Sequence, residues 1–150
     1  MSVTKTFTVT VANPGAGNRY YIDGVLQETV NLIEGNTYRF DQSDSTNGGH
    51  PFKFSTTSNG THNGGSEYTT GVTINGTPGQ AGSYTEIAVA IGAPQLYYYC
   101  QYHSGMGGQA NTVDSSVIRV LTVTVANPGA GNRYYIDGVL QETVNLAEGY

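Results

Sequence analysis

The 150-residue sequence is poor in several residue types, and each scarcity limits what the chain can do. Only 11% of the residues are charged, the net charge is −5 and no basic cluster occurs, which argues against a nucleic-acid partner. No stretch approaches the ~18 consecutive apolar residues of a membrane-spanning helix. There is one cysteine, Cys100, so an intrachain disulfide is excluded and the thiol is inert, intermolecular or a metal ligand.

Catalytic and targeting signatures are also missing. The sequence has no nucleophile elbow, phosphate-binding loop, HExxH pair or Ser/His/Asp arrangement, so we do not expect an enzyme. Its first residues, MSVTKTFTVTV, alternate Thr and Val where a signal peptide would have a continuous apolar run. We therefore expect a protein that is made in the cytoplasm without a signal peptide.

Short segments of alternating apolar and polar residues dominate the chain. Phe7, Val9 and Val11 alternate with threonines, and this period of two is typical of a half-buried strand. Asp23-Gly24 lies between Tyr-Tyr-Ile and Val-Leu and predicts a hairpin. Further strands are expected near residues 30–32, 38–40, 51–54, 84–89 and 96–100, and no segment has helical periodicity. The pattern predicts an all-β fold, a Greek-key β-sandwich.

The end of the sequence repeats its beginning. Residues 122–150 repeat residues 8–36 at an offset of 114, with 27 of 29 positions identical. Such a short segment cannot bury a core alone. We predict one module over 1–116 and a partial second repeat over 117–150. This second part packs on a neighbouring subunit or exchanges strands with it, is disordered, or begins a longer array.

Two segments have little strand character. Residues 55–83 are rich in Ser, Thr, Asn and Gly, which predicts a long irregular surface region. Residues 107–113, GGQANTV, alternate poorly. The last strand of the module could therefore run later, through residues 117–120.

One ten-residue stretch, YYYCQYHSGM at residues 97–106, concentrates metal-ligating side chains. Cys100, His103 and Met106 are each separated by two residues, and the glycines that follow them let the backbone turn back. A thiolate, imidazoles and a weak thioether are the donors of a trigonal His2Cys copper site with a long axial Met. His50, in GGHPFKF, is the candidate for the second imidazole.

Each of these residues also has a simpler interpretation. Cys100 could be a small buried apolar residue, Met106 a core filler and His103 a partner in a turn. His50 could be an exposed loop histidine beside two glycines. The joint spacing favours metal binding, and copper over zinc because a thioether is a poor zinc donor. His62 has no partner pattern and is expected to be exposed.

The motif C-x2-H-x2-M after alternating aromatics, with an upstream His before a short apolar strand, resembles the cupredoxins, the blue-copper β-sandwich proteins. The resemblance covers roughly residues 6–113. It implies that His50, Cys100, His103 and Met106 are the ligands of one copper ion per complete module. The wider sequence also resembles the repeated domains of large virion structural proteins of marine bacteriophages.

Two functions from different classes follow. The first is a structural module of a virion decoration, tail or fibre protein, in which copper braces the loops. Its partners would be other copies of itself or other structural subunits, contacted through residues 117–150, in a virion or another extracellular assembly. The second is a blue-copper electron carrier. The near-identical repeat favours the first.

Overall fold

The computed structural model describes residues 2–117 and 121–140. The chain divides into two compact units, Met1–Ser115 and Ser116–Tyr150, and each is described by itself. The division into a module and a partial repeat stays a prediction. Among the described residues, no helix is long and apolar enough to cross a membrane.

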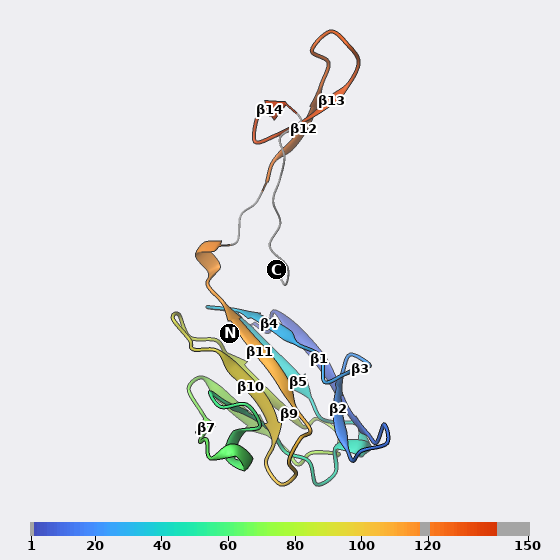
Figure 1. Cartoon of the computed structure of the whole chain (residues 1–150), viewed down its shortest axis with the longest axis vertical. Coiled ribbons are helices and arrows are strands. Elements are labelled where there is room, and N and C mark those ends of the chain that lie inside the picture. Colours follow the sequence, from blue (N-terminus) through green and yellow to red (C-terminus); the bar gives the residue numbers. More distant parts are fainter. Residues whose placement is uncertain (1, 118–120, 141–150) are drawn as a thin grey trace. The chain divides into compact units, whose positions relative to one another are not determined.

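The first unit is a sandwich of two β-sheets (Figure 1). One sheet has the order β3 (Val25–Leu26), β2 (Arg19–Ile22), β1 (Lys5–Ala12), β5 (Thr37–Asp41), β9 (Tyr84–Ala88), β8 (Val72–Asn75). The other has the order β4 (Val30–Ile33), β11 (Gly108–Val113), β10 (Leu96–Cys100), β6 (Phe52–Ser55), β7 (Glu67–Tyr68). The predicted all-β Greek-key sandwich is confirmed.

The two sheets are joined by an aromatic core. Phe52 of β6 stacks on Phe40 of β5 at 4.7 Å between ring centroids, and on Tyr98 of β10 at 5.0 Å. All three rings are fully buried. Because Phe40 belongs to one sheet and Phe52 and Tyr98 to the other, this stack holds the two layers face to face, and each aromatic pair adds about 0.5–1.5 kcal/mol beyond the area it buries.

The predicted hairpin is present between β2 and β3. Asp23 and Gly24 have φ angles of 49° and 83°, and positive values at both central residues define the type I′ turn that suits the twist of a hairpin. Ile22 pairs with Val25 across this turn.

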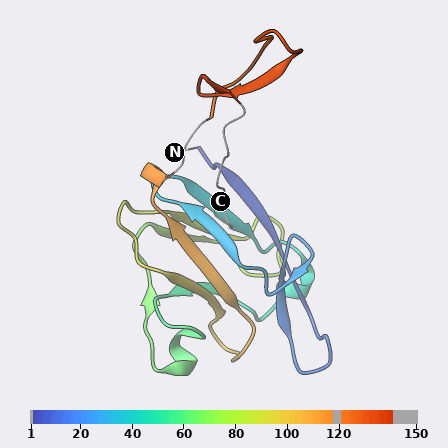
Figure 2. The same ribbon diagram turned by 45° about the horizontal axis from the view of Figure 1, so that its top comes forward.

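The chain passes back and forth between the two sheets as it advances. β1 lies parallel to β5, and β4 lies parallel to β11, one parallel pair in each sheet (Figure 2). A parallel pair cannot be joined by a tight turn, so the chain crosses repeatedly from one sheet to the other. These crossings gather the interstrand loops at the two ends of the sandwich.

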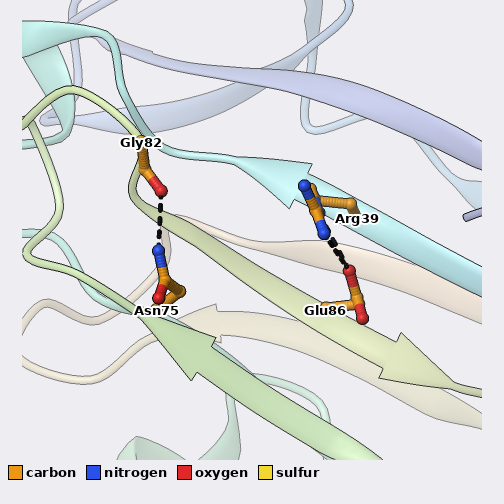
Figure 3. Close-up of polar contacts among 4 residues, drawn as sticks. All are labelled: Arg39, Asn75, Gly82 and Glu86. Atoms are coloured by element: carbon orange, nitrogen blue, oxygen red, sulfur yellow. Dashed lines mark hydrogen bonds and ion pairs between the residues drawn. The ribbon is translucent and has the colours of Figure 1, made fainter.

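Two polar side-chain contacts lie in the sheet that contains β5, β9 and β8. Arg39 and Glu86 are neighbours across β5 and β9, with Nε donating to Oε2 at 2.9 Å (Figure 3). At the end of β8, Asn75 Nδ2 donates to the carbonyl of Gly82 at 2.9 Å (Figure 3). Both pairs lie on the surface, where ion pairs and hydrogen bonds add specificity more than stability.

Most of residues 55–83 is irregular, as expected, whereas the expectation that residues 107–113 make a poor strand is wrong. Residues 55–83 contain a 3-10 turn, η2 (Gly60–Asn63), and the strands β7 and β8. Residues 108–113 form β11, which hydrogen-bonds to β10 on one side and β4 on the other. Pairing on both edges makes this strand, although only Ala110 and Val113 are buried. Val117 ends a second short turn, η3 (Ser115–Val117), and 118–120 lie outside the described residues.

The second unit contains a small sheet of β12 (Val123–Ala126), β13 (Arg133–Ile136) and β14 (Val139–Leu140). Val123 pairs with Ile136, at the same offset of 114 from the Val9 and Ile22 pair of the first unit. The repeated sequence therefore forms the same local ribbon. Residues 141–150 of the repeat lie outside the described part of the chain.

Candidate metal centre

Two paired strands bring the distant candidates together. β10 runs antiparallel to β6, with Cys100 opposite Phe52, so His50 lies beside the loop that leaves β10. We call residues 100–107, from the last residue of β10 to the start of β11, the ligand loop. This loop and η2 lie at the same end of the sandwich (Figure 1).

Three of the four predicted ligand residues converge. Cys100 Sγ lies 3.7 Å from His50 Nδ1 and 3.6 Å from His103 Nδ1. The two imidazole rings are 4.6 Å apart between centroids, and the three ligand atoms lie within 4.8 Å of one another. This group could hold a metal ion.

The spacing of these atoms fits a single small ion. Bonds of about 2.0–2.3 Å from one ion to a nitrogen and a sulfur, at angles between tetrahedral and trigonal, separate the two atoms by roughly 3.6–3.8 Å. Both sulfur–nitrogen distances agree with this value. The donor set of one thiolate and two imidazoles is the one that suits copper.

Met106 lies where the ligand loop joins β11. Its side chain is 1% exposed and belongs to the same buried cluster as Cys100. The backbone N–H of Tyr20 donates to the Met106 carbonyl at 2.9 Å, which fixes the end of the loop. The role of Met106 as a weak axial ligand stays a prediction.

The group is buried except at one histidine. His50 is 7% exposed and Cys100 is fully buried, whereas His103 is exposed. His50 is therefore no exposed loop histidine. Burial lowers the pKa of His50, and the neighbouring His103 lowers it further. His50 is thus neutral near pH 7, with a ring lone pair available for a metal.

Hydrogen bonds hold the main chain of His50 from β2 and from the residue that follows β5. Its main-chain carbonyl accepts from Tyr20 Oη at 2.7 Å and from Gln42 Nε2 at 2.8 Å. The Asn18 amide lies 3.4 Å from His50 Nε2, the ring nitrogen that points away from Cys100. Burial raises the pKa of the Tyr20 phenol, and the nearby Cys100 raises it further, so this phenol stays a donor.

The ligand loop is held on the side of β3. Gln27 Nε2 donates to the carbonyls of Gly105 at 3.1 Å and Gly107 at 2.6 Å. Gly107 passes so close to β10 that a Cβ there would overlap the carbonyl of Tyr98. Glycine is needed at 107 for this close approach, a reason distinct from the turning freedom expected from the sequence.

On the other side, η2 supplies contacts that the sequence did not predict. His62 Nε2 lies 2.8 Å from the carbonyl of Cys100, and Asn59 bonds both Ser104 and Gly105. His62 is exposed as expected, and its contact with Cys100 is one that no sequence pattern indicated. No local motif signals this contact, because it depends on the path of residues 55–66.

The chain has distant structural likenesses among known proteins. No protein-family model matches the sequence, and no curated protein matches it. A solved structure of reduced rusticyanin is similar at 16% identity over 75% of this chain and 82% of that one, with a TM-score of 0.44. Rusticyanin from Thiobacillus ferrooxidans matches at 14% identity over 75% and 79%, with a TM-score of 0.43.

Rusticyanin is a cupredoxin, and a cupredoxin-like fold is what the motif in the ligand loop implied. The strand order of residues 2–115 makes the sandwich, and the same strand pairing brings His50, Cys100 and His103 together.

Proposed function

We propose that the first unit binds one copper ion through Cys100 Sγ, His50 Nδ1 and His103 Nδ1, with Met106 as a weaker fourth donor, and acts as a one-electron carrier. The observation that carries the proposal is the pair of sulfur–nitrogen separations, 3.7 and 3.6 Å, in a buried thiolate and imidazole set. Copper bound there would alternate between its +1 and +2 states and so supply one-electron chemistry.

The surroundings of the three side chains suit this role. The main chain of His50 is fixed by Tyr20 and Gln42, so the ligands need not rearrange between oxidation states. The fully buried Phe52 and Tyr98 belong to the same core cluster as Cys100 and exclude water from that side. His103 alone reaches solvent among the three, so it is the point at which an electron would enter or leave.

Electrochemistry of the copper-loaded protein tests the proposal. We expect a reversible one-electron wave that is lost in Cys100→Ser. In His103→Gly, which removes the exposed imidazole, we expect added imidazole to restore the wave. Copper that binds but is not reversibly reduced would contradict the electron-carrier role and favour a structural one.

A second function, that of a subunit in an assembly, is favoured by the second unit. Val123, Val125 and Tyr134 are 57%, 57% and 64% exposed, whereas their counterparts in the first unit are among its buried core residues: Val9 at 0%, Val11 at 8%, Tyr20 at 0%. An apolar face that one copy of the ribbon buries is uncovered in the other. Exposed apolar faces of this kind commonly mark interaction sites.

The occupant that we propose for this face is another copy of the chain. Residues 30–113 of a second copy already cover a ribbon of identical sequence, residues 8–29, in the same strand register. The copy also repeats the residues that hold the metal centre: Asn132 for Asn18, Tyr134 for Tyr20, Gln141 for Gln27. Strand exchange would let the second ribbon take the place of the first.

Light scattering of the full chain tests the assembly. We expect oligomers for the native sequence and for Thr124→Asp, which changes the opposite face of β12. Val125→Asp places a charge on the apolar face and should give monomers. Oligomers that persist in Val125→Asp would contradict a role of this face.

A virion or other extracellular assembly remains our proposed setting, which electron microscopy of native particles would test.

A further inference from the structure

The segment around η2 holds the ligand loop at three points. His62 lies 2.8 Å from the Cys100 carbonyl, Asn59 Nδ2 donates to Ser104 Oγ at 2.8 Å, and Gly105 N donates to Asn59 Oδ1 at 2.9 Å. These bonds join residues 38 to 46 positions apart in the sequence. They therefore link a surface turn directly to the loop that carries the predicted ligands.

The bond from His62 has a defined direction. A carbonyl oxygen only accepts, so His62 Nε2 carries the proton and donates it to Cys100. The positive end of this N–H lies against the peptide of Cys100, a few bonds from the sulfur. Donors close to a thiolate stabilise electron-rich states of a bound metal.

The His62 ring is held in place by the core. It lies edge-on to the Tyr99 ring, with centroids 6.2 Å apart and planes at 83°. Tyr99 is 1% exposed, and a Cβ at Gly60 would overlap its ring. Gly60 thus lets η2 lie directly on Tyr99, and this packing sets the height of His62 above Cys100.

Asn59 is fixed as firmly. Its φ angle of 64° is left-handed, a conformation that Asn tolerates better than most residues. Its amide uses both ends on the ligand loop, one as donor and one as acceptor. Together with Gln27 on the opposite side, Asn59 encloses the turn at Gly105.

We propose that His62 and Asn59 are positioning residues that keep the ligand loop in its metal-ready arrangement before any ion arrives, and that the N–H of His62 raises the reduction potential of the centre. The inference rests on the proposed copper function for the second clause only. The first clause concerns the metal-free protein, because all three bonds exist between protein atoms.

The reactivity of the Cys100 thiol in the metal-free full chain tests the first clause. His62→Leu keeps an apolar body on Tyr99 but removes the donor, and Asn59→Gly keeps the left-handed backbone but removes both bonds. Each should raise the rate of reaction with an aromatic disulfide by roughly two- to tenfold, the factor set by losing a hydrogen bond. Asn63→Ala, an exposed neighbour in η2, is the matched control and should leave the rate unchanged.

The reduction potential of the copper-loaded protein tests the second clause. His62→Leu should lower it, and His62→Gln, which restores an N–H donor, should return it toward the native value. Equal potentials for the native chain and His62→Leu, or for His62→Gln and His62→Leu, would overturn the electrostatic role. Unchanged thiol rates in His62→Leu and Asn59→Gly would overturn the positioning role. Raised thiol rates in the two variants, together with a native chain that binds no copper, would retain the positioning role and reject the copper function.

Discussion

The phenol of Tyr20 donates a hydrogen bond to the main-chain carbonyl of His50 at 2.7 Å, within a fully buried part of the sandwich. Tyr20 belongs to β2 and its own N–H bonds the carbonyl of Met106. One residue of the N-terminal ribbon therefore ties together both ends of the predicted copper centre. The repeat supplies a second tyrosine, Tyr134, in the same sequence context but 64% exposed.

This pair of tyrosines gives a matched test of the Tyr20 bond. Tyr20→Phe removes the donor but leaves Gln42 on the His50 carbonyl, so we expect a loss of about 1 kcal/mol in the free energy of unfolding. In the Val125→Asp background, which we expect to be monomeric, Tyr134→Phe changes an exposed phenol and should stay within about 0.5 kcal/mol of its parent. Urea denaturation followed by circular dichroism measures both. Equal losses in Tyr20→Phe and Tyr134→Phe would mean that the bond to His50 contributes nothing to the free energy of unfolding.

The close approach at Gly107 makes a second prediction. A Cβ at this position would overlap the Tyr98 carbonyl, so Gly107→Ala must displace either β10 or the ligand loop. We expect a loss of more than about 2 kcal/mol in stability together with impaired copper binding. In Gly105→Asn the nearest atoms to the new Cβ are 3.8 Å away and Asn accepts positive φ, so it is the control. A fully stable Gly107→Ala that binds copper normally would contradict the packing at this point.

Copper should stabilise the folded chain. An ion that binds only the folded form adds about 2.7 kcal/mol when its free concentration is one hundred times the dissociation constant. Thermal unfolding with and without copper, and again after chelation, measures this difference. Cys100→Ser should show almost none of it. A copper-dependent rise of equal size in Cys100→Ser would place the ion elsewhere.

Exchange between the two ribbons predicts non-additive effects. Val9→Asp puts a charge in the core of the first unit, yet the second ribbon could replace the first and reduce the damage. Adding Val123→Asp removes this replacement, so the double variant should lose far more stability than the sum of the single changes. Strict additivity, with Val123→Asp harmless in both backgrounds, would contradict strand exchange.

The ligand loop was predictable because its chemistry is local. Cys100, His103 and Met106 lie within seven residues, and the strand before them fixes which way the cysteine points. His50 needed the family resemblance, since its place beside Cys100 arises from the pairing of β6 with β10. Donor type and spacing thus predicted Cys100 and His103, the family resemblance added His50, and strand pairing brings the three together.

Other parts of the centre could not be predicted from local patterns. Strand β11 has few apolar residues and is maintained by hydrogen bonds on both of its edges, which the local sequence does not reveal. Asn59 and His62 lie in a polar segment that resembles any surface loop, and only the packing of Gly60 on Tyr99 gives them their positions. Contacts of this kind depend on tertiary structure and leave no periodic signal in the sequence.

The proposed copper centre requires that Cys100, His50 and His103 bind one ion. Titration of the metal-free full chain with Cu(II), followed by visible absorption and by the count of free thiol, shows whether they do. We expect an intense thiolate-to-copper band that saturates at one equivalent while Cys100 ceases to react as a free thiol. No band at any ratio, with the thiol still fully reactive, would contradict it.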